Sequence, residues 1–241
     1  MKKLFIIKAG SSFADTAEKY GDFDEMIFRG LGLDLTAVKI VTAYRGEPLP
    51  EPSRCFGVVI TGAHCMVTDN LPWSLAIESW IPSLIEQKVP VLGICYGHQL
   101  LGRAMGGQVG YHPQGEEVGT VDIRLCPASS DDPLFANLPQ RFPAHVSHSQ
   151  TILTLPQGAV LLAENDFEPH HAFRIGGCAW GVQFHPEFNC GITREDILKQ
   201  SDELTRAGRD VEALLRNVRE TPQATGLLAI FARLATAGKC S

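Results

Sequence analysis

The sequence predicts an α/β fold: a doubly wound, mainly parallel sheet with helices on both faces. Short runs rich in β-branched residues alternate with helical patterns over the first two thirds of the 241-residue chain. Several of these runs, such as VVI and VLGI, are apolar throughout, which is typical of strands covered on both faces. The repeated order of strand, helix and strand favours parallel pairing through crossover connections.

The strands expected in this region cover residues 3–7, 38–42, 58–60, 89–94 and 121–125. A helix is predicted between the third and fourth strands because apolar residues repeat there at helical spacing, namely Trp73, Ile77, Trp80, Ile81, Leu84 and Ile85. Another helix follows the fourth strand, with an apolar face of Leu100, Leu101, Ala104 and Met105. Ligands of such sheets bind beyond the carboxyl ends of the strands, so the chemistry is expected just after residues 60 and 94.

The rest of the chain contains two regions whose sequence patterns differ from that of the first. Residues 107–181 contain more Gly, Pro and short alternating runs, which predicts antiparallel strands and hairpins. Residues 193–237 have a helical pattern with a break at Thr221-Pro222. We expect a single domain over residues 1–241, with a core over about 1–190 and a helical C-terminal extension over about 191–241. An apolar stripe in the extension would pack on the chain's own sheet or across a homodimer, or hold a partner: Ile197, Leu204, Val211, Leu214, Leu215 and Val218.

The composition excludes several classes of protein. The chain is 44% hydrophobic and 20% charged, as globular proteins are, and its net charge of −6 is not interrupted by a Lys/Arg cluster. Nucleic acid and anionic membranes are therefore not expected as partners. The apolar stretch near the N-terminus ends at Lys8, too soon for a secretory signal or a membrane span. Seven cysteines without a CxxC pair indicate a reducing compartment, the cytoplasm.

A cysteine follows the fourth strand in a setting that suits a nucleophile. In PVLGICYGHQ, Cys95 lies between Gly93 and Gly97, at the end of an apolar strand and the start of a helix. This is the strand-to-helix elbow of G-x-S-x-G enzymes with Cys in place of Ser, where bulky neighbours would clash with the strained turn. The helix N-terminus favours the thiolate. The alternative is a small buried thiol between two turn glycines.

A base and a carboxylate occur together about ninety residues further on. In GVQFHPEF, His185 and Glu187 follow another apolar run. Because residues i and i+2 of an extended chain point the same way, Glu187 can reach the ring nitrogen of His185 that does not face the sulfur. An activated nucleophile needs a base oriented by a third group. An isolated His-Pro-Glu would be an ordinary surface turn, but its pairing with the Cys95 elbow favours catalysis.

Together these motifs resemble the class I, triad-type glutamine amidotransferases. The resemblance lies in GICYGHQLLGRAMGG and WGVQFHPEF, and extends to VVITGA at 58–63, DPLF at 132–135 and VSHSQ at 146–150. Within the family, the chain looks most like stand-alone members related to the glutaminase domain of GMP synthase, and it also resembles the γ-glutamyl peptidases. The resemblance implies a flavodoxin-like fold and the hydrolysis of a γ-glutamyl amide, L-glutamine by default, without a cofactor.

The resemblance also implies a role for each residue. Cys95 would attack the side-chain carbonyl of glutamine, His185 would carry the proton to departing ammonia, and Glu187 would hold the imidazole. The backbone of Gly62, Ala63 and Tyr96 would supply the N–H groups of the oxyanion hole. The substrate contacts would come from the helix after the nucleophile and from the SHSQ segment, at Gln99, Ser147, Ser149 and Gln150.

Two positions depart from the family pattern. Many relatives have Gly-Gly-Pro where this chain has Gly62-Ala63-His64, and alanine lacks the freedom of glycine at positive φ. The oxyanion segment is therefore expected to differ in shape or to form only on activation. Gln150 stands where many relatives have a small acidic residue, which leaves the α-amino contact and the substrate open.

The other histidines and cysteines are interpreted as structural. His98 is expected to pack or cap beside the elbow, and His148 to support the substrate-side loop. Glu168-Pro169-His170-His171 is expected to be a solvated hairpin, so no metal site is predicted. Ordinary thiols are expected at Cys55, Cys65, Cys126, Cys178, Cys190 and Cys240.

Three functions fit this sequence. The first is a glutaminase that supplies ammonia to a synthase on another chain, because this one has no GxxxxGK[ST] or SGGxDS-like loop. The second is a γ-glutamyl peptidase, which would use the same triad and needs no partner. The third is a non-catalytic regulatory or scaffold module, which the intact triad disfavours. An α/β-hydrolase esterase is disfavoured because it would prefer Ser and an acid before the His.

Overall fold

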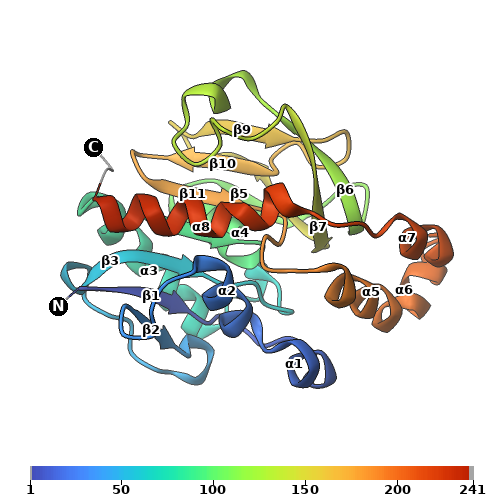
Figure 1. Cartoon of the computed structure of the whole chain (residues 1–241), viewed down its shortest axis with the longest axis horizontal. Coiled ribbons are helices and arrows are strands. Elements are labelled where there is room, and N and C mark those ends of the chain that lie inside the picture. Colours follow the sequence, from blue (N-terminus) through green and yellow to red (C-terminus); the bar gives the residue numbers. More distant parts are fainter. Residues whose placement is uncertain (1, 239–241) are drawn as a thin grey trace.

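The computed structural model describes residues 2–238, so Cys240 lies outside the part described here. Within it, a nine-stranded sheet forms the centre of the molecule (Figure 1). Its strands, in sheet order, are β2 (Val38–Val41), β1 (Lys3–Ile7), β3 (Cys55–Ile60), β4 (Val91–Ile94), β11 (Ala179–Val182), β10 (Ala172–Ile175), β9 (Val160–Glu164), β6 (Glu117–Leu125) and β7 (Arg141–His148). A separate ribbon pairs β5 (Gln108–Tyr111) with β8 (Gln150–Thr154).

The sheet has a parallel half and an antiparallel half. Strands β2, β1, β3, β4 and β11 pair in parallel, and the pairings from β11 through β10, β9 and β6 to β7 are antiparallel. This confirms the predicted α/β class, with its mainly parallel core and an antiparallel section from the middle of the chain.

Two strands begin earlier than predicted because glycines interrupt their apolar pattern. Strand β3 starts at Cys55 rather than at residue 58, and Gly57 pairs with Leu4 of β1. A Cβ atom at Gly57 would lie only 2.9 Å from the side chain of Ala235. Strand β6 starts at Glu117 rather than at residue 121, through a Gly119 with a φ of +109°.

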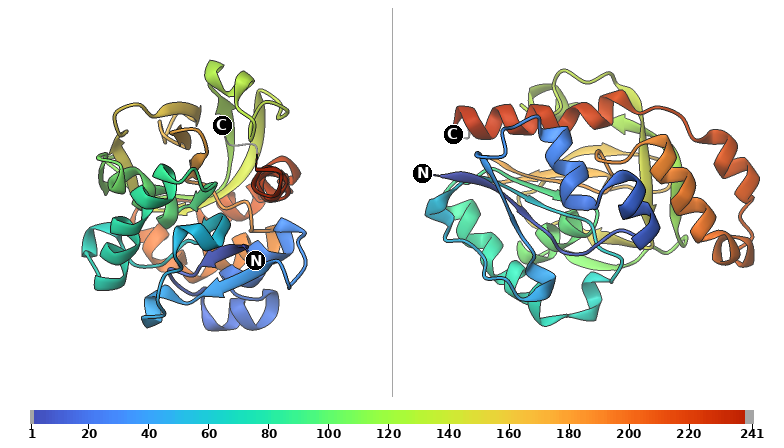
Figure 2. Two further views of the ribbon diagram at one scale, coloured as in Figure 1. Left: turned by 90° about the vertical axis from the view of Figure 1, so that its left-hand side faces the viewer. Right: turned by 60° about the horizontal axis from the view of Figure 1, so that its bottom comes forward.

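Helices cover both faces of the parallel half (Figures 1 and 2). On one face, α2 (Phe23–Leu31) and α8 (Pro222–Ala237) share an apolar cluster with Leu4 and Ile6 of β1. On the other face, α3 (Pro72–Glu86) and α4 (Tyr96–Ala104) share a second cluster with Phe5 and Ile7. Both α3 and α4 were expected from their periodicity.

The sequence analysis missed the helices α1 (Ala14–Tyr20) and α2. A local signal for α2 exists, because Asp22 and Glu25 form a capping box at its start. Lys8, just after β1, bridges Asp22 at 2.6 Å and Asp24 at 2.7 Å. This half-buried cation therefore ties the start of α2 to the end of the first strand.

The remaining helices of the described chain gather beside β6 and β7, at the end of the molecule opposite to where β1 begins (Figure 1). They are α5 (Cys190–Lys199), α6 (Ser201–Arg206) and α7 (Val211–Asn217). The predicted apolar stripe packs within the chain, since Ile197, Leu204 and Val218 form a cluster with Val118 of β6. Short 3₁₀ turns occur at Ala43–Arg45, Pro52–Arg54, Val67–Asp69 and Pro127–Asp131. In the part of the chain that the structure describes, every helix is too short or too polar to cross a bilayer.

Candidate active site

Cys95 occupies a strained turn between β4 and α4. Its φ of +48° and ψ of −97° are rare for a residue with a side chain. The flanking glycines allow this turn, because a Cβ atom at Gly93 would lie 2.3 Å from the carbonyl oxygen of Gly97, and one at Gly97 would lie 2.4 Å from that of Ile60. The turn brings Cys95, on the carboxyl side of β4, next to the equivalent end of β3.

His185 and Glu187 lie beside this turn, just beyond the carboxyl end of β11. The imidazole Nδ1 of His185 lies 2.8 Å from Oε1 of Glu187, and the ring interacts with Cys95 on its other side. Burial alone lowers the pKa of His185, but the charges of Glu187 and Cys95 and the hydrogen bonds to both raise it well above its ordinary value. The ring of Phe188 stacks on the imidazole at 4.1 Å between centroids and fixes its plane. The thiol of Cys95 also points toward the carbonyl oxygen of Ser147, at 3.8 Å.

The predicted oxyanion segment follows β3 and faces the same point. A Cβ atom at Gly62 would lie 3.1 Å from Cε1 of His185 and 3.9 Å from Cβ of Cys95. Thr61 fixes the segment, because its hydroxyl accepts a hydrogen bond from the N–H of Ala9 and donates one to the carbonyl of Gly62. The side chain of Ala63 fits against Gly10, where a Cβ atom would lie 2.9 Å from it.

The substitution of Ala63 for glycine is accommodated without strain, since residues 62–64 all have negative φ angles. Tyr96 is the first residue of α4, and the first N–H groups of a helix have no partner within it. The roles of Gly62, Ala63 and Tyr96 as oxyanion donors stay predictions.

A cavity of about 300 Å³ opens at Cys95. Every residue that was predicted to contact the substrate lies on its wall, namely Gln99, Ser147, Ser149 and Gln150. Two of them are joined by a hydrogen bond, in which Nε2 of Gln99 donates to the backbone carbonyl oxygen of Gln150 at 2.7 Å. Nε2 of Gln150 donates to the hydroxyl of Thr68 at 2.6 Å and so connects β8 to the turn after the oxyanion segment. Their contacts with a substrate stay predictions.

The sequence analysis missed further residues that line the same cavity. Gln200, just before α6, and Glu203 within α6 line it together with Glu116, and Nε2 of Gln200 donates to Oδ2 of Asp196 at 2.9 Å. Burial raises the pKa of Asp196 although hydrogen bonds to Ser147 and Gln200 oppose the shift. The i, i+4 spacing of Asp196 and Gln200 predicts a shared helix face, but only the fold turns that face toward Cys95.

The oxyanion side of the cavity also holds residues that the sequence analysis did not assign. His64 lies between the rings of Phe13, at 4.4 Å between centroids, and Phe23, at 5.9 Å. Burial lowers the pKa of His64. These aromatic contacts anchor the chain just beyond Ala63 where many relatives have proline.

One expectation about the histidines is wrong and two agree with the structure. Glu168 and His171 are fully buried rather than solvated, and Nε2 of His171 lies 3.3 Å from Glu117 because that segment folds under β6. His148 supports the substrate-side loop as expected, with Nε2 3.1 Å from the same carboxylate. His98 is buried against Phe173. Residues 2–238 contain no group of three or more His, Cys, Asp or Glu side chains arranged to hold a metal ion.

Comparison with known proteins places this geometry in a family. The family model described as glutamine amidotransferase class-I matches residues 20–203. The chain is 36% identical over 142 residues to a glutamine-hydrolyzing GMP synthase of Aeropyrum pernix, which covers 59% of this chain and 25% of that protein. It is 30% identical over 199 residues to gamma-glutamyl peptidase 5 of Arabidopsis thaliana, which covers 80% of this chain and 78% of that one.

The match to GMP synthases is therefore partial, since the chain spans a quarter or less of the length of two of them, 25% and 20%. Solved structures extend the likeness of fold over the whole chain. A glutamine amidotransferase from Thermotoga maritima aligns over 98% of both chains with a TM-score of 0.76 at 24% identity. One from Methylobacillus flagellatus aligns over 99% of this chain and 95% of that one, with a TM-score of 0.72 at 23% identity. By its motifs, its family match and its fold, the chain belongs to the class I glutamine amidotransferases, a triad-type glutaminase family.

Proposed function

We propose that this chain hydrolyses the side-chain amide of glutamine, or of a related γ-glutamyl compound, through a thioester on Cys95. The observation that carries the proposal is the cluster of Cys95, His185 and Glu187 beside a cavity that Cys95 lines, with His185 between its two partners. In this arrangement the thiol is next to a base, and the base is held by a carboxylate, as nucleophilic catalysis requires.

The proposed reaction gives each of these groups a role. The sulfur of Cys95 forms a bond to the amide carbon, and its proton passes to His185. The developing oxyanion is stabilised by N–H groups of the Gly62-Ala63 segment and of Tyr96. His185 returns the proton to the nitrogen as the C–N bond breaks, and ammonia leaves. A water molecule then attacks the thioester with His185 as base, the C–S bond breaks, and glutamate is released.

The test is release of glutamate and ammonia from glutamine by the purified chain, with Cys95→Ala as the control. The proposal predicts turnover that the substitution abolishes, together with labelling of Cys95 by an electrophilic glutamine analogue. Some amidotransferase subunits turn over only with their synthase. Labelling without turnover would therefore support a partner-dependent glutaminase. Neither turnover nor labelling would contradict catalysis by this chain and favour a regulatory or scaffold role.

A γ-glutamyl peptidase is the second candidate. It is favoured by the similarity to the Arabidopsis peptidase, which spans most of both chains, whereas the matched GMP synthases are covered over 20–35% of their length. Parallel assays with a γ-glutamyl dipeptide separate the two candidates, because a glutaminase would not release the amino acid from it. A synthase partner, a homodimer and a cytoplasmic location stay predictions from the sequence.

A further inference from the structure

Gln200 lines the cavity that contains Cys95, and one end of its amide is held by the protein. Nε2 of Gln200 faces Oδ2 of Asp196 at 2.9 Å, the backbone carbonyl oxygen of Asp196 at 3.3 Å and the hydroxyl of Ser147 at 3.2 Å. A backbone carbonyl oxygen only accepts hydrogen bonds, so the opposite orientation of the amide would bring two acceptors together. The orientation is therefore fixed. Among the described residues no donor reaches Oε1, which is left to accept from a ligand.

Asp196 holds the amide of Gln200 in this orientation. It lies one helical turn earlier in α5, it is 9% exposed, and it also makes a hydrogen bond with the hydroxyl of Ser147. Burial raises the pKa of Asp196, so a charged carboxylate at this position costs stability. Both of its hydrogen-bond partners line the cavity. The position of Asp196 is therefore suited to ordering the cavity lining.

Ser147 lies between Gln200 and the nucleophile. Its carbonyl oxygen accepts from the thiol of Cys95 at 3.8 Å, whereas its hydroxyl contacts Nε2 of Gln200 at 3.2 Å. The reacting carbon of a γ-glutamyl amide must lie at Cys95, and a short aliphatic chain joins that carbon to the α-carbon. Because only Ser147 separates Gln200 from Cys95 along these contacts, Gln200 is placed to contact a group on the α-carbon.

The acceptor character of Oε1 selects one group of the substrate. A γ-glutamyl amide carries donors at two places, the scissile amide nitrogen and the α-ammonium group, whereas its α-carboxylate is an acceptor. In the proposed reaction the amide nitrogen takes a proton from His185, so it must lie there rather than at Gln200. The α-ammonium group is therefore the donor that fits Oε1 of Gln200.

A second amide that lines the cavity, that of Gln99, has an orientation fixed in the same way. Nε2 of Gln99 donates to the backbone carbonyl oxygen of Gln150 at 2.7 Å and to Oε1 of Gln183 at 3.0 Å, so both of its hydrogen atoms are used. Oε1 of Gln99 likewise has no donor among the described residues. The cavity thus offers two amide oxygens as acceptors, and an ammonium group with three N–H bonds can donate to more than one.

We propose that Gln200 binds the α-ammonium group of the γ-glutamyl substrate through Oε1, and that Asp196 is the positioning residue that holds the Gln200 amide. This inference rests on the proposed function and deepens it, because it assigns a substrate contact outside the sequence motifs. It applies to glutamine and to γ-glutamyl peptides alike, since both carry this group. The bonds formed and broken at Cys95 are those given above.

Removal of the α-amino group from the substrate tests the contact. Glutaramate is glutamine without that group, and it is followed as a substrate, or as a competitive inhibitor if it is not cleaved. Gln200→Met keeps the length of the side chain but removes the acceptor. We expect KM for glutamine to rise about tenfold with little change in kcat, and the preference for glutamine over glutaramate to fall by the same factor. Gln87→Met, at an exposed position outside the cavity, is the matched control and should change neither.

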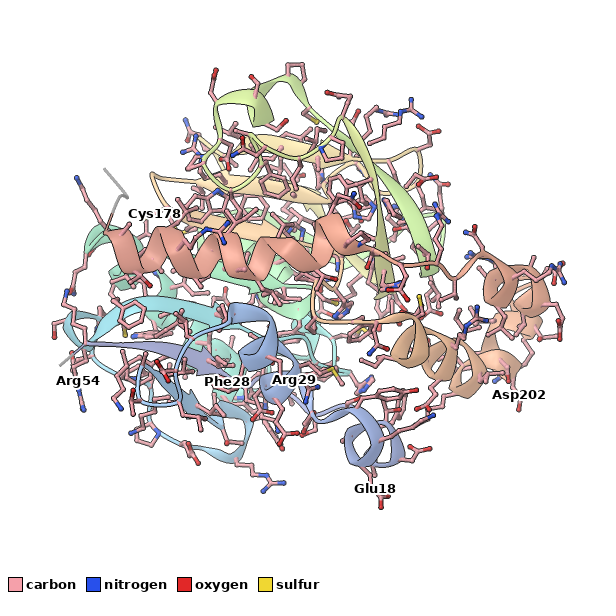
Figure 3. All side chains as sticks on the ribbon, viewed as in Figure 1. Glu18, Phe28, Arg29, Arg54, Cys178 and Asp202 are labelled. Atoms are coloured by element: carbon pink, nitrogen blue, oxygen red, sulfur yellow. The ribbon has the colours of Figure 1, made fainter. Side chains whose placement is uncertain are left out.

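Variants of Asp196 separate positioning from a general loss of structure. Asp196→Ala should reproduce the loss of preference, because the amide of Gln200 is then free to turn, and Gln200→Met should add little in the double variant. Asp196→Asn can keep both hydrogen bonds and should restore the preference. Asp202→Ala is the control, because it removes a carboxylate from α6 at the outer edge of the molecule (Figure 3).

The outcomes separate this inference from the proposed function. Equal losses for glutamine and glutaramate in Gln200→Met would overturn it, since a general defect of the cavity affects both. Additive losses in the double variant would overturn the role of Asp196. A loss of preference in Glu203→Gln but not in Gln200→Met would assign the ammonium group to Glu203 and overturn the role of Gln200. Hydrolysis that Cys95→Ala abolishes leaves the proposed function standing in each case.

The same comparison can be made if the chain is labelled without turnover. The concentration of the electrophilic glutamine analogue that gives the half-maximal labelling rate then replaces KM, and an analogue without the α-amino group replaces glutaramate. If no amide is cleaved and Cys95 is not labelled, the proposed function itself fails, and this inference fails with it.

For a γ-glutamyl peptidase, a γ-glutamyl dipeptide and the corresponding glutaryl compound take the places of glutamine and glutaramate. The expected changes in Gln200→Met and Asp196→Ala are the same, because the amine part of the substrate has no role in this contact.

Discussion

At the scale of single residues, the state of His185 depends on its two neighbours. Its ring is buried, and burial disfavours the charged imidazolium. Glu187 on one side and Cys95 on the other reverse this preference, and the carboxylate contacts Nδ1 at 2.8 Å. The second oxygen of Glu187, Oε2, is buried without a partner in the described chain, so the charge of this carboxylate is directed mainly at the imidazole.

Replacing Glu187 with Gln should therefore change the protonation of His185 more than its position. The amide keeps an acceptor for Nδ1–H but removes the negative charge, so the pKa of His185 should fall toward its ordinary value of about 6.5. A titration of the imidazole resonances by NMR measures this shift. If the proposed mechanism holds, amide hydrolysis should also fall by about 10²-fold or more. Glu86→Gln, on the surface of α3, should change neither, and an unaltered titration in Glu187→Gln would contradict the electrostatic argument.

At the scale of elements, the features that could be predicted correctly are those formed by residues close together in the sequence. The elbow could be predicted because its glycines, its nucleophile and its strand are contiguous in GICYG. The parallel strands could be predicted because each is a short apolar run between helical patterns. The starts of β3 and β6 were missed because glycine and buried polar residues hide the strand pattern, as Gly57 and Glu117 show.

The part of the cavity lining formed by Glu116, Gln200 and Glu203 could not be predicted from the sequence for a different reason. Glu116 and Glu203 are far apart in the chain and line one cavity only because the fold brings their segments together. Burial of His171 was also missed, because its partner, Glu117, comes from a distant strand. A single sequence contains no local pattern for such contacts. The Cys95 and His185 motifs, in contrast, each include the apolar strand end that precedes the functional residue.

The elbow glycines give a test at this scale. Gly97→Ala would place a Cβ atom 2.4 Å from the carbonyl oxygen of Ile60, and backbone atoms cannot move aside as a flexible side chain can. We expect a loss of about 1–3 kcal/mol in the free energy of unfolding, measured by urea denaturation. Gly226→Ala in α8 is the control, because a Cβ atom there meets nothing within 4 Å. It should stabilise the protein by about 0.5–1 kcal/mol, and equal effects of the two substitutions would contradict this argument.

At the scale of the whole molecule, the last helix belongs to the core. Phe231 of α8 is fully buried, and its ring lies 6.3 Å from that of Trp180 in β11. Phe231→Ala should therefore lower the free energy of unfolding by about 3–5 kcal/mol, whereas the exposed Arg233→Ala on the same helix should have little effect. The single domain predicted over residues 1–241 requires that tryptophan fluorescence and far-UV circular dichroism report one transition in both variants. Two separated transitions would make that prediction wrong.

The pH dependence of stability tests how the whole fold tolerates one buried carboxyl group, that of Asp196. Burial raises the pKa of Asp196, so the folded protein holds this proton more tightly than the unfolded chain does. A group of this kind lowers stability as pH rises from its unfolded pKa, about 3.8, through its folded pKa, and it costs nothing below that range. Asparagine can keep the contacts with Ser147 and Gln200 without the charge.

Asp196→Asn should therefore be more stable than the parent protein at neutral pH, and the difference should shrink as the pH is lowered toward 4. Urea denaturation at several values between pH 4 and 8 measures this difference, with Asp202→Asn as an exposed control whose effect should stay small throughout. A difference that grows on acidification would mean that hydrogen bonds and the nearby His185 stabilise the charged carboxylate more than burial destabilises it.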